Sequence, residues 1–335
     1  MKLWRAAIAA LGLAGLPLEL ARANDSEAEV GLGGLELKQN GAISMDSEDL
    51  YISQDEVRVR YRFTNRSDRD VKALVSFPVP MLPDGIAGNY SYTSMPDYSR
   101  LEFRTTIDGK PAPLDYVQRA EVAGRDVTSL LTAMGWPMRW FDGADGQPAF
   151  LARVSAKDRA AFLKDGLLKR SAEDPATLIP AWNLVTHVTR SQMFPAGKTV
   201  EVTHRYVPIA GGSVGGGLYK AVRKGEGEAH YRRRYCTDNA FFAGFDRRIA
   251  ALALSSSAGM SSEVWLSYIL RPGANWRGPI GDFRLVIDKG KPGNLVSFCM
   301  DGVRKISPTQ FEVRKRNFEP ARDIDVLIVE FGGGE

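Results

Sequence analysis

Residue types that commonly carry catalysis or bind metals are scarce in this sequence. Its 335 residues include three histidines, His187, His204 and His230, and two cysteines, Cys236 and Cys299. The cysteines form no CxxC pair, and neither an HExxH zinc motif nor a DxDxDG calcium loop occurs. The sequence therefore predicts no catalytic residue, no metal ligand and no cofactor. A Ser, a His and an Asp that meet only in the folded chain would leave no such motif, so a hydrolase remains an alternative.

Long hydrophobic runs are also missing, apart from one at the start of the chain. A short basic segment precedes the apolar run at residues 6–18, and Ala21-Arg-Ala23 is a small-x-small cleavage site. This pattern predicts a signal peptide at residues 1–23, cleaved after Ala23, and export to the periplasm. The run is shorter than the roughly 20 apolar residues that a membrane helix needs. We expect a secreted chain with no membrane span after cleavage.

An excess of charge of one sign is absent as well. The formal charge is +4, but removal of residues 1–23 leaves 41 basic and 39 acidic residues. A nucleic-acid binder needs a clustered basic face, so no nucleic-acid partner is expected. The local run Arg232 to Arg234, between Tyr231 and Tyr235, is interpreted as the solvated face of a strand.

The two cysteines are interpreted as one structural bond. An exported protein enters an oxidising compartment, where an even number of cysteines without metal-site spacing favours a disulfide. We predict that Cys236 and Cys299 are joined.

Most of the chain has the pattern of β-strands. From Val57 to Phe63, apolar residues alternate strictly with arginines, which is typical of a half-buried strand. A turn at residues 65–68 and a second alternating run at residues 71–77 complete a predicted antiparallel hairpin. A third run, residues 101–107, ends at the turn signal Asp108-Gly109.

Residues 111–180 interrupt this alternation and are predicted to form a partly helical insertion. Helices are expected at residues 126–134 and 155–168, and Ser155 and Asp158 have the spacing of a helix-capping box. Between the two helices, Trp136 and Trp140 are candidate ligand-contact aromatics. The competing interpretation is that they cover the small core of the insertion, because large aromatic rings supply much of the buried area.

Two histidines fall on the arms of a predicted hairpin, residues 182–194 and 199–208. A two-residue turn would bring His187 and His204 onto one face, where they could bind a metal. Pro195-Ala-Gly197 better suits a type I turn closed by a glycine bulge, which places them on opposite faces. We predict a hydrogen-bonded His204 in the core, a solvated His187, and no metal site.

The fold class predicted is mainly β, with two antiparallel sandwich-like domains. The first domain covers residues 24–210 and carries the insertion, and the second covers residues 218–335. The glycine-rich run at residues 211–217 lacks the Gly-Lys-Ser/Thr ending of a phosphate-binding loop and is predicted to be the linker. Strands punctuated by Gly and Pro are expected in the second domain at residues 264–270, 283–288, 295–300, 311–316 and 324–331.

Several segments together resemble a bacterial family catalogued as domain-of-unknown-function family 4424. The resemblance spans nearly all of the chain after residue 23, and its motifs are specific as a set: Glu48-Asp-Leu-Tyr-Ile-Ser53, Val57-Arg-Val-Arg-Tyr-Arg-Phe63 with residues 65–70, Tyr206-Val-Pro208 before Gly211, and Asn275-Trp-Arg-Gly-Pro-Ile-Gly281 through Asp288-Lys-Gly290. It implies an exported bacterial protein in the periplasm. It assigns no activity, substrate or site residue.

Two hypotheses follow for function. Sandwich domains most often present faces and loops for binding, which favours a noncatalytic periplasmic binding or interaction module for an envelope component or a small ligand. The alternative is a periplasmic hydrolase of unrecognised type. A histidine in a cleft within reach of a Ser, Asp or Glu would favour the hydrolase.

Overall fold

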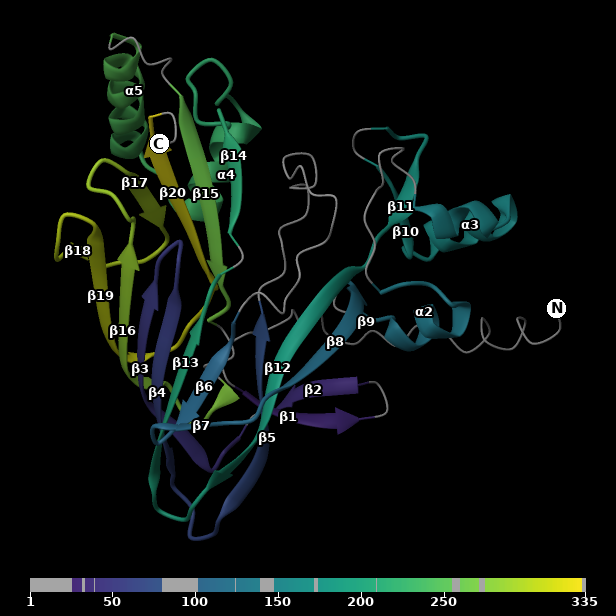
Figure 1. Ribbon diagram of the computed structural model, residues 1–335, viewed down its shortest axis with the longest axis vertical. Helices are drawn as coiled ribbons and strands as arrows, with labels where there is room; N and C mark the ends of the chain where they lie inside the picture. Colours follow the sequence, from purple (N-terminus) through teal and green to yellow (C-terminus); the bar gives the residue numbers. More distant parts are fainter. Residues whose placement is uncertain are drawn as a thin grey trace.

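The computed structural model describes most of the chain after the predicted signal peptide (Figure 1). The described residues are 26–31, 34–38, 40–79, 102–123, 125–138, 148–171, 174–208, 210–254, 260–270 and 275–332. The predicted signal peptide and Trp140 lie outside these ranges.

The largest sheet, here called the large sheet, has eight described strands. Its order is β18 (Arg304–Lys305), β19 (Gln310–Phe318), β16 (Ile280–Asp288), β3 (Ile43–Ile52), β4 (Val57–Asn65), β13 (Thr199–Tyr206), β6 (Arg104–Ile107) and β7 (Lys110–Pro111). Neighbouring strands pair antiparallel except β16 and β3, which pair parallel from Asp282 opposite Ser47 to Ile287 opposite Ile52.

Two further sheets pack against the large sheet. The six-stranded sheet has the order β2 (Gly34–Lys38), β1 (Ser26–Gly31), β5 (Val71–Val79), β12 (Asn183–Phe194), β8 (Asp115–Val122) and β9 (Arg125–Asp126). The four-stranded sheet has the order β14 (Gly211–Val214), β15 (Ser261–Tyr268), β20 (Ile324–Phe331) and β17 (Leu295–Phe298). A short ribbon of β10 (Leu168–Arg170) and β11 (Leu178–Pro180) stands apart.

One continuous hydrophobic core lies between these layers. It joins Val59 and Phe63 of the large sheet to Phe77 of the six-stranded sheet and to Leu266 and Val326 of the four-stranded sheet. Strand β4 shows the predicted alternation, with its apolar residues buried and its arginines exposed. The mainly β, sandwich-like class predicted from sequence is confirmed.

The boundary predicted between two domains differs from the structure. Residues 211–214 are strand β14, paired with β15, and are not a free linker. Strand β16 lies after the glycine-rich run, and it extends the same sheet as β3, which lies before it. The two predicted sandwiches therefore share one sheet and one core.

The glycine-rich run is explained by a close approach to Glu263 on β15. A Cβ atom at Gly216 would lie 1.9 Å from Oε1 of Glu263, and one at Gly212 would lie 2.7 Å from its backbone oxygen. The buried carboxylate of Glu263 accepts hydrogen bonds from Tyr231 (2.8 Å) and Trp265 (2.9 Å). Glycine is needed because only a chain without side chains can pass this closely.

The predicted hairpin of residues 182–208 is wrong. Gly197 has a φ of +65°, and the Lys198 N–H donates to the Pro195 carbonyl, as expected for a tight turn. The turn nevertheless carries the chain from one sheet to the other, so Phe194 pairs with Val71 of β5 and Thr199 with Thr64 of β4. Strands β12 and β13 each have an apolar face. These two faces are buried better when the strands lie in opposite sheets, with the core between them, than when they pair side by side in one sheet.

Helices replace the strand predicted around Arg232 to Arg234. The segment is α4 (Glu226–Tyr235), followed by α5 (Asn239–Leu254). Tyr231 and Tyr235, four residues apart, are the buried residues of α4, and Glu228 pairs with Arg232 at 2.7 Å. Spacing of four is a helical signal that the sequence prediction missed.

The predicted insertion, residues 111–180, is partly helical but contains more strand than expected. It holds α2 (Thr128–Met134), the 3₁₀ helix η3 (Ala149–Arg153) and α3 (Ala156–Lys164). Strand β8 also falls in this range and pairs with β12 as part of the six-stranded sheet. The helices therefore belong to an excursion that begins after β9, the short strand that pairs with β8.

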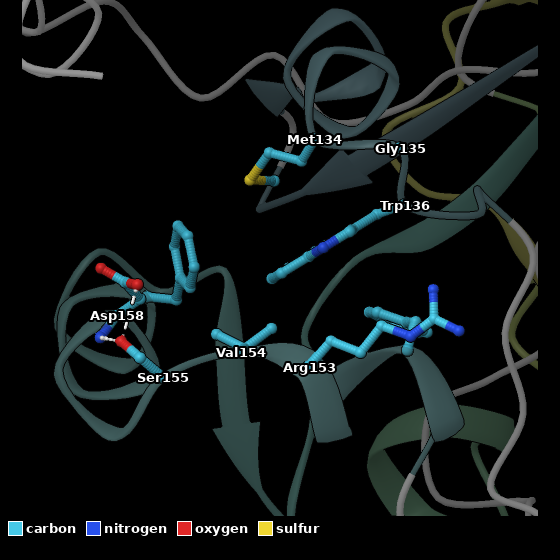
Figure 2. A pocket seen from close by; sticks show the side chains of 9 residues that line it. Met134, Gly135, Trp136, Arg153, Val154, Ser155 and Asp158 are labelled. Carbon is cyan, nitrogen blue, oxygen red and sulfur yellow. Dashed lines mark hydrogen bonds between the residues drawn. The ribbon is translucent and has the colours of Figure 1, made fainter. Parts of the chain in front are cut away.

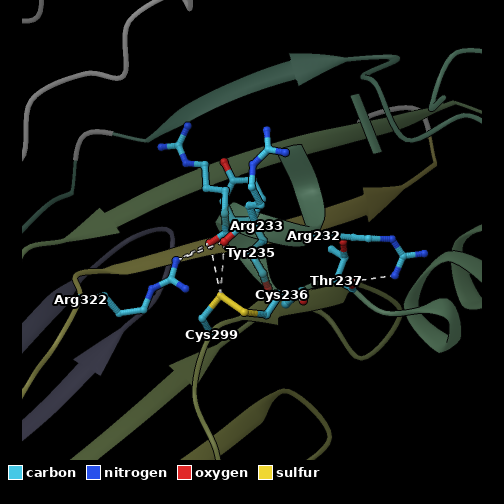
Figure 3. The surroundings of a disulfide bond; sticks show 9 residues. Arg232, Arg233, Tyr235, Cys236, Thr237, Cys299 and Arg322 are labelled. Atoms are coloured by element: carbon cyan, nitrogen blue, oxygen red, sulfur yellow. Dashed lines mark hydrogen bonds between the residues drawn. A yellow bond between two sulfur atoms is a disulfide. The ribbon is translucent and has the colours of Figure 1, made fainter. Parts of the chain in front are cut away.

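A disulfide joins Cys236, at the C-terminal cap of α4, to Cys299, which follows β17 (Figure 3). Their Cα atoms are 5.1 Å apart across a sequence separation of 63. Arg322 donates to the backbone carbonyls of Arg233 (3.4 Å) and Arg234 (3.2 Å) beside the bond. The disulfide therefore fixes the end of α4 against the four-stranded sheet.

Replacing both cysteines by serine is expected to lower the free energy of unfolding by about 4 kcal/mol, the loop-entropy value for a closed loop of about this length. Urea titration of the oxidised protein and the double variant measures the change. Reductant should destabilise the wild type by a similar amount and leave the variant unaffected. Two free thiols in the native, unreduced protein would contradict the bond.

Gly281→Ala should destabilise the junction of β16 and β3. A Cβ atom there would lie 2.6 Å from the backbone oxygen of Asp46, so the strands would have to shift. Overpacking of this kind costs about 1–3 kcal/mol. Gly41→Ala is the matched control, because no atom lies within 4 Å of its added Cβ. Equal urea midpoints for the two variants would refute the close approach.

Candidate functional site

The helical excursion builds a small core of its own beside the six-stranded sheet. Leu131 of α2, Leu151 of η3 and Trp182 before β12 are buried together in it. The N-terminus of α3 is capped by Ser155, which accepts from the Asp158 N–H (3.1 Å) and donates to Oδ2 of Asp158 (2.7 Å). The predicted N-terminal cap at Ser155 is confirmed and fixes where α3 begins, although Asp158 accepts from the Ser155 hydroxyl and not from its backbone N–H as in a full capping box.

A pocket of about 600 Å³ opens between α2, η3 and α3 (Figure 2). Its volume lies within the range of about 300–1,000 Å³ typical of small-molecule sites. The apolar part of its wall consists of Met134, Trp136, Phe150, Val154 and Phe162, and the polar part of Arg153, Ser155 and Asp158.

Trp136 is central to this pocket. Its ring lies 5.1 Å from those of Phe150 and Phe162 and 5.9 Å, nearly parallel, from that of Trp182. The ring is partly exposed, so it packs on the small core and also lines the pocket. The contacts with the small core agree with the competing interpretation of Trp136, while its contact with a ligand stays a prediction.

The two charged side chains of the pocket, Asp158 and Arg153, differ in whether another side chain already contacts them. Asp158 is engaged by Ser155, as described above. Arg153 is exposed and makes no ion pair within the described part of the chain. In Figure 2, Arg153 and Asp158 lie on opposite sides of the Trp136 ring. The free cation next to aromatic rings suits a ligand that combines an apolar ring with a negative charge.

The histidines are not brought together. His204 of β13 is buried and shares a hydrogen bond of 2.7 Å with Thr105, as predicted for a core histidine. His187 of β12 lies in a different sheet and is also buried, so its predicted solvation is wrong. Within the described ranges, His, Cys, Asp and Glu side chains form no group of three or more that could hold a metal.

Side chains from the two neighbouring strands, β5 and β8, contact the ring of His187. Its Nδ1 lies 3.0 Å from Oγ of Ser76, and Nη2 of Arg119 lies 3.3 Å from its Nε2. Arg119 also pairs with Glu121 at 2.9 Å. Burial, together with the Arg119 cation, lowers the pKa of His187 to about 3.

The hydrogen bonds of His187 do not make Ser76 a nucleophile. A guanidinium group only donates, so Nε2 of His187 must accept from Arg119. The proton of the neutral ring is then on Nδ1 and is donated to Ser76. A general base would have to accept the proton of the serine instead.

Residues 211–215, Gly-Gly-Ser-Val-Gly, match the letters of the GxSxG motif of serine hydrolases. Such a serine stands on a sharp turn between a strand and a helix. Ser213 instead lies inside β14, opposite Glu263 of β15. Ser213 therefore matches the motif in sequence only and lacks the strand-to-helix turn that exposes a nucleophile.

Comparison with known proteins gives a family and distant structural likenesses, of which one is described here. The model of a family described as a domain of unknown function (DUF4424) matches residues 23–327. A "putative nutrient binding protein" of Legionella pneumophila is similar in structure, with 12% identity, a TM-score of 0.42, and coverage of 92% of this chain and 70% of that one. A search of curated sequences finds no match. No helix in the described ranges is long and apolar enough to cross a membrane.

His187 should make the protein less stable in acid. Its pKa falls from the usual 6.5 to about 3 on folding, so the unfolded chain binds a proton that the folded chain excludes between these values. The contribution is complete above about pH 6.5 and is lost, by about 1.4 kcal/mol per pH unit, as the pH falls toward 3. Urea midpoints across this range should decline less steeply for His187→Gln. Parallel curves would show that His187 titrates normally.

Proposed function

The chain belongs to the DUF4424 family, and we propose that it is a noncatalytic binding protein of the periplasm. Its ligand site is the pocket between α2, η3 and α3. The observation that carries the proposal is the partly exposed ring of Trp136 beside the unpaired guanidinium of Arg153, in a cavity of about 600 Å³.

The pocket has the composition of a binding site. Aromatic rings supply a large contact area at low entropic cost, and a few polar groups at the rim orient the ligand. Trp136, Phe150 and Phe162 form the apolar surface, while Arg153 provides the charge. The ligand class that fits is a small molecule with a planar or apolar ring and an acidic group.

The scaffold favours a preformed site. Ser155 fixes the start of α3, and Nε1 of Trp182 donates to the carbonyl of Met138 at 3.0 Å, just beyond Trp136. Side chains held by such contacts lose little entropy when a ligand binds.

The alternative, a periplasmic hydrolase, finds weaker support. Ser76 and His187 lie within hydrogen-bond distance of each other, but their proton arrangement is opposite to that of a nucleophile and its base. Phe162 and Trp136 line the pocket, but no histidine does.

Location in the periplasm rests on two features. The predicted signal peptide at residues 1–23 directs export. The disulfide between Cys236 and Cys299 persists in an oxidising compartment.

Anilinonaphthalene sulfonate, which combines aromatic rings with an anionic group, is a suitable probe of the pocket. We expect its fluorescence to rise on saturable binding to the folded protein. Trp136→Ala and Arg153→Gln should each weaken binding about tenfold, the loss expected for one ring or one charged contact worth about 1.4 kcal/mol. Arg153 is exposed, so its variant should remain folded.

Two controls separate the pocket from the rest of the surface. Tyr116→Ala removes an exposed aromatic ring on β8, and Lys157→Gln removes a charge on α3, and neither residue lines the pocket. Both should bind the probe as the wild type does. Undiminished binding by the Trp136 and Arg153 variants would exclude this pocket. Covalent labelling by a fluorophosphonate that is lost in Ser76→Ala would favour the hydrolase instead.

A further inference from the structure

A second hollow, of about 480 Å³, lies on the outward face of the large sheet. It is built from β3, β4, β13, β16 and β19, and shares no residue with the pocket at Trp136. Arg58, Arg60 and Arg284 line it together with Tyr51, Thr203 and Val286. Two of the three arginines of β4 that alternate with buried residues, Arg58 and Arg60, thus face a concave surface.

The register of the paired strands determines which charged side chains are neighbours in this hollow. Arg60 lies between Asp49 of β3 and Thr203 of β13, and Asp49 lies between Arg60 and Arg284 of β16. Two guanidinium groups therefore flank a single carboxylate in one row across the sheet. A net positive charge remains in the row.

The carboxylate of Asp49 forms an ion pair with Arg284. Nη1 of Arg284 lies 3.0 Å from Asp49, and its Nε lies 2.8 Å from Glu312. Arg60 has no carboxylate within 4.0 Å among the described residues, although it is directly opposite Asp49. The donors of Arg60 are thus free for a ligand.

Arg58 adds a second available cation. Its guanidinium lies over the ring of Tyr51, 5.1 Å from the centroid, which holds it in the hollow. Its closest carboxylate contact is 3.6 Å, to Glu56, which also pairs with Arg205. The hydroxyl of Tyr51 and the amide of Gln310 both donate to Asp288, so that nearby carboxylate is already engaged.

We propose that this hollow binds the oxyanion group, carboxylate or phosphate, of a small ligand. Arg60 and Arg58 supply the charge-assisted donors, since arginine can hold an oxyanion with two parallel hydrogen bonds. Thr203 offers a hydroxyl from the neighbouring strand, and Val286, only 3% exposed, gives the hollow an apolar base. The site does not depend on the pocket at Trp136.

Arg62 provides a matched control on the same strand. It points to the same face two residues beyond Arg60, but its cross-strand neighbours are Ser47 and Glu201, and it does not line the hollow. Arg60→Gln and Arg62→Gln change the net charge of the protein equally. A general attraction of anions to the sheet would weaken equally in both variants.

Titration calorimetry with inorganic pyrophosphate at low salt tests the proposal. The wild type should bind it with a dissociation constant of about 1 mM or tighter. Arg60→Gln and Arg58→Gln should each weaken binding about tenfold, the loss of one charge-assisted hydrogen bond. Arg60→Lys should recover only part of the affinity because lysine cannot bind in the bidentate manner. Arg62→Gln should stay within about twofold of the wild type.

Vesicles containing phosphatidylglycerol identify the source of the oxyanion. Cosedimentation that pyrophosphate displaces and Arg60→Gln abolishes would support a lipid headgroup in the hollow. Pyrophosphate binding without cosedimentation would support a free small ligand. Equal weakening by Arg60→Gln and Arg62→Gln, or a wild type that binds neither probe, would overturn the proposal.

Discussion

The parallel pairing of β16 with β3 is the constraint on which the rest of the structure depends. It joins β16, which comes late in the sequence, to β3, which comes early, and it makes eight strands one sheet. The approach is tight, since no side chain fits between Gly281 and Asp46. Because this sheet is shared, the six-stranded and four-stranded sheets pack on the same inner face and bury one core.

Both proposed sites are built on surfaces that this core leaves free. The pocket at Trp136 lies on the helical excursion from the six-stranded sheet, whereas the arginine-lined hollow lies on the outward face of the large sheet. Each combines side chains from elements that the packing holds in place, which is the usual arrangement for a binding protein. They differ in chemistry, because the first offers aromatic rings and the second guanidinium groups.

Buried polar groups show how the fold restricts chemistry elsewhere. Burial raises the pKa of Glu263, while Tyr231 and Trp265 donate hydrogen bonds to its carboxylate. His187 is kept neutral by burial and by Arg119. In both places the hydrogen bonds are used within the protein, so these groups stabilise a unique packing and are poorly suited to proton transfer.

The sequence by itself determined the features that depend on neighbouring residues and on composition. The alternation of β4, the helix cap at Ser155 and the single possible cysteine pair were all predictable, because local periodicity and counting specify them. Trp136 was a candidate because paired tryptophans stood out between two predicted helices, although the residues that line the pocket with it could not be foreseen. Only the tertiary structure decided that the turn at Gly197 links two sheets, that the glycine-rich run passes Glu263, and that Arg60 lacks a carboxylate while Arg284 has two. These outcomes depend on which distant strands become neighbours, and a strand's own alternation is compatible with many partners.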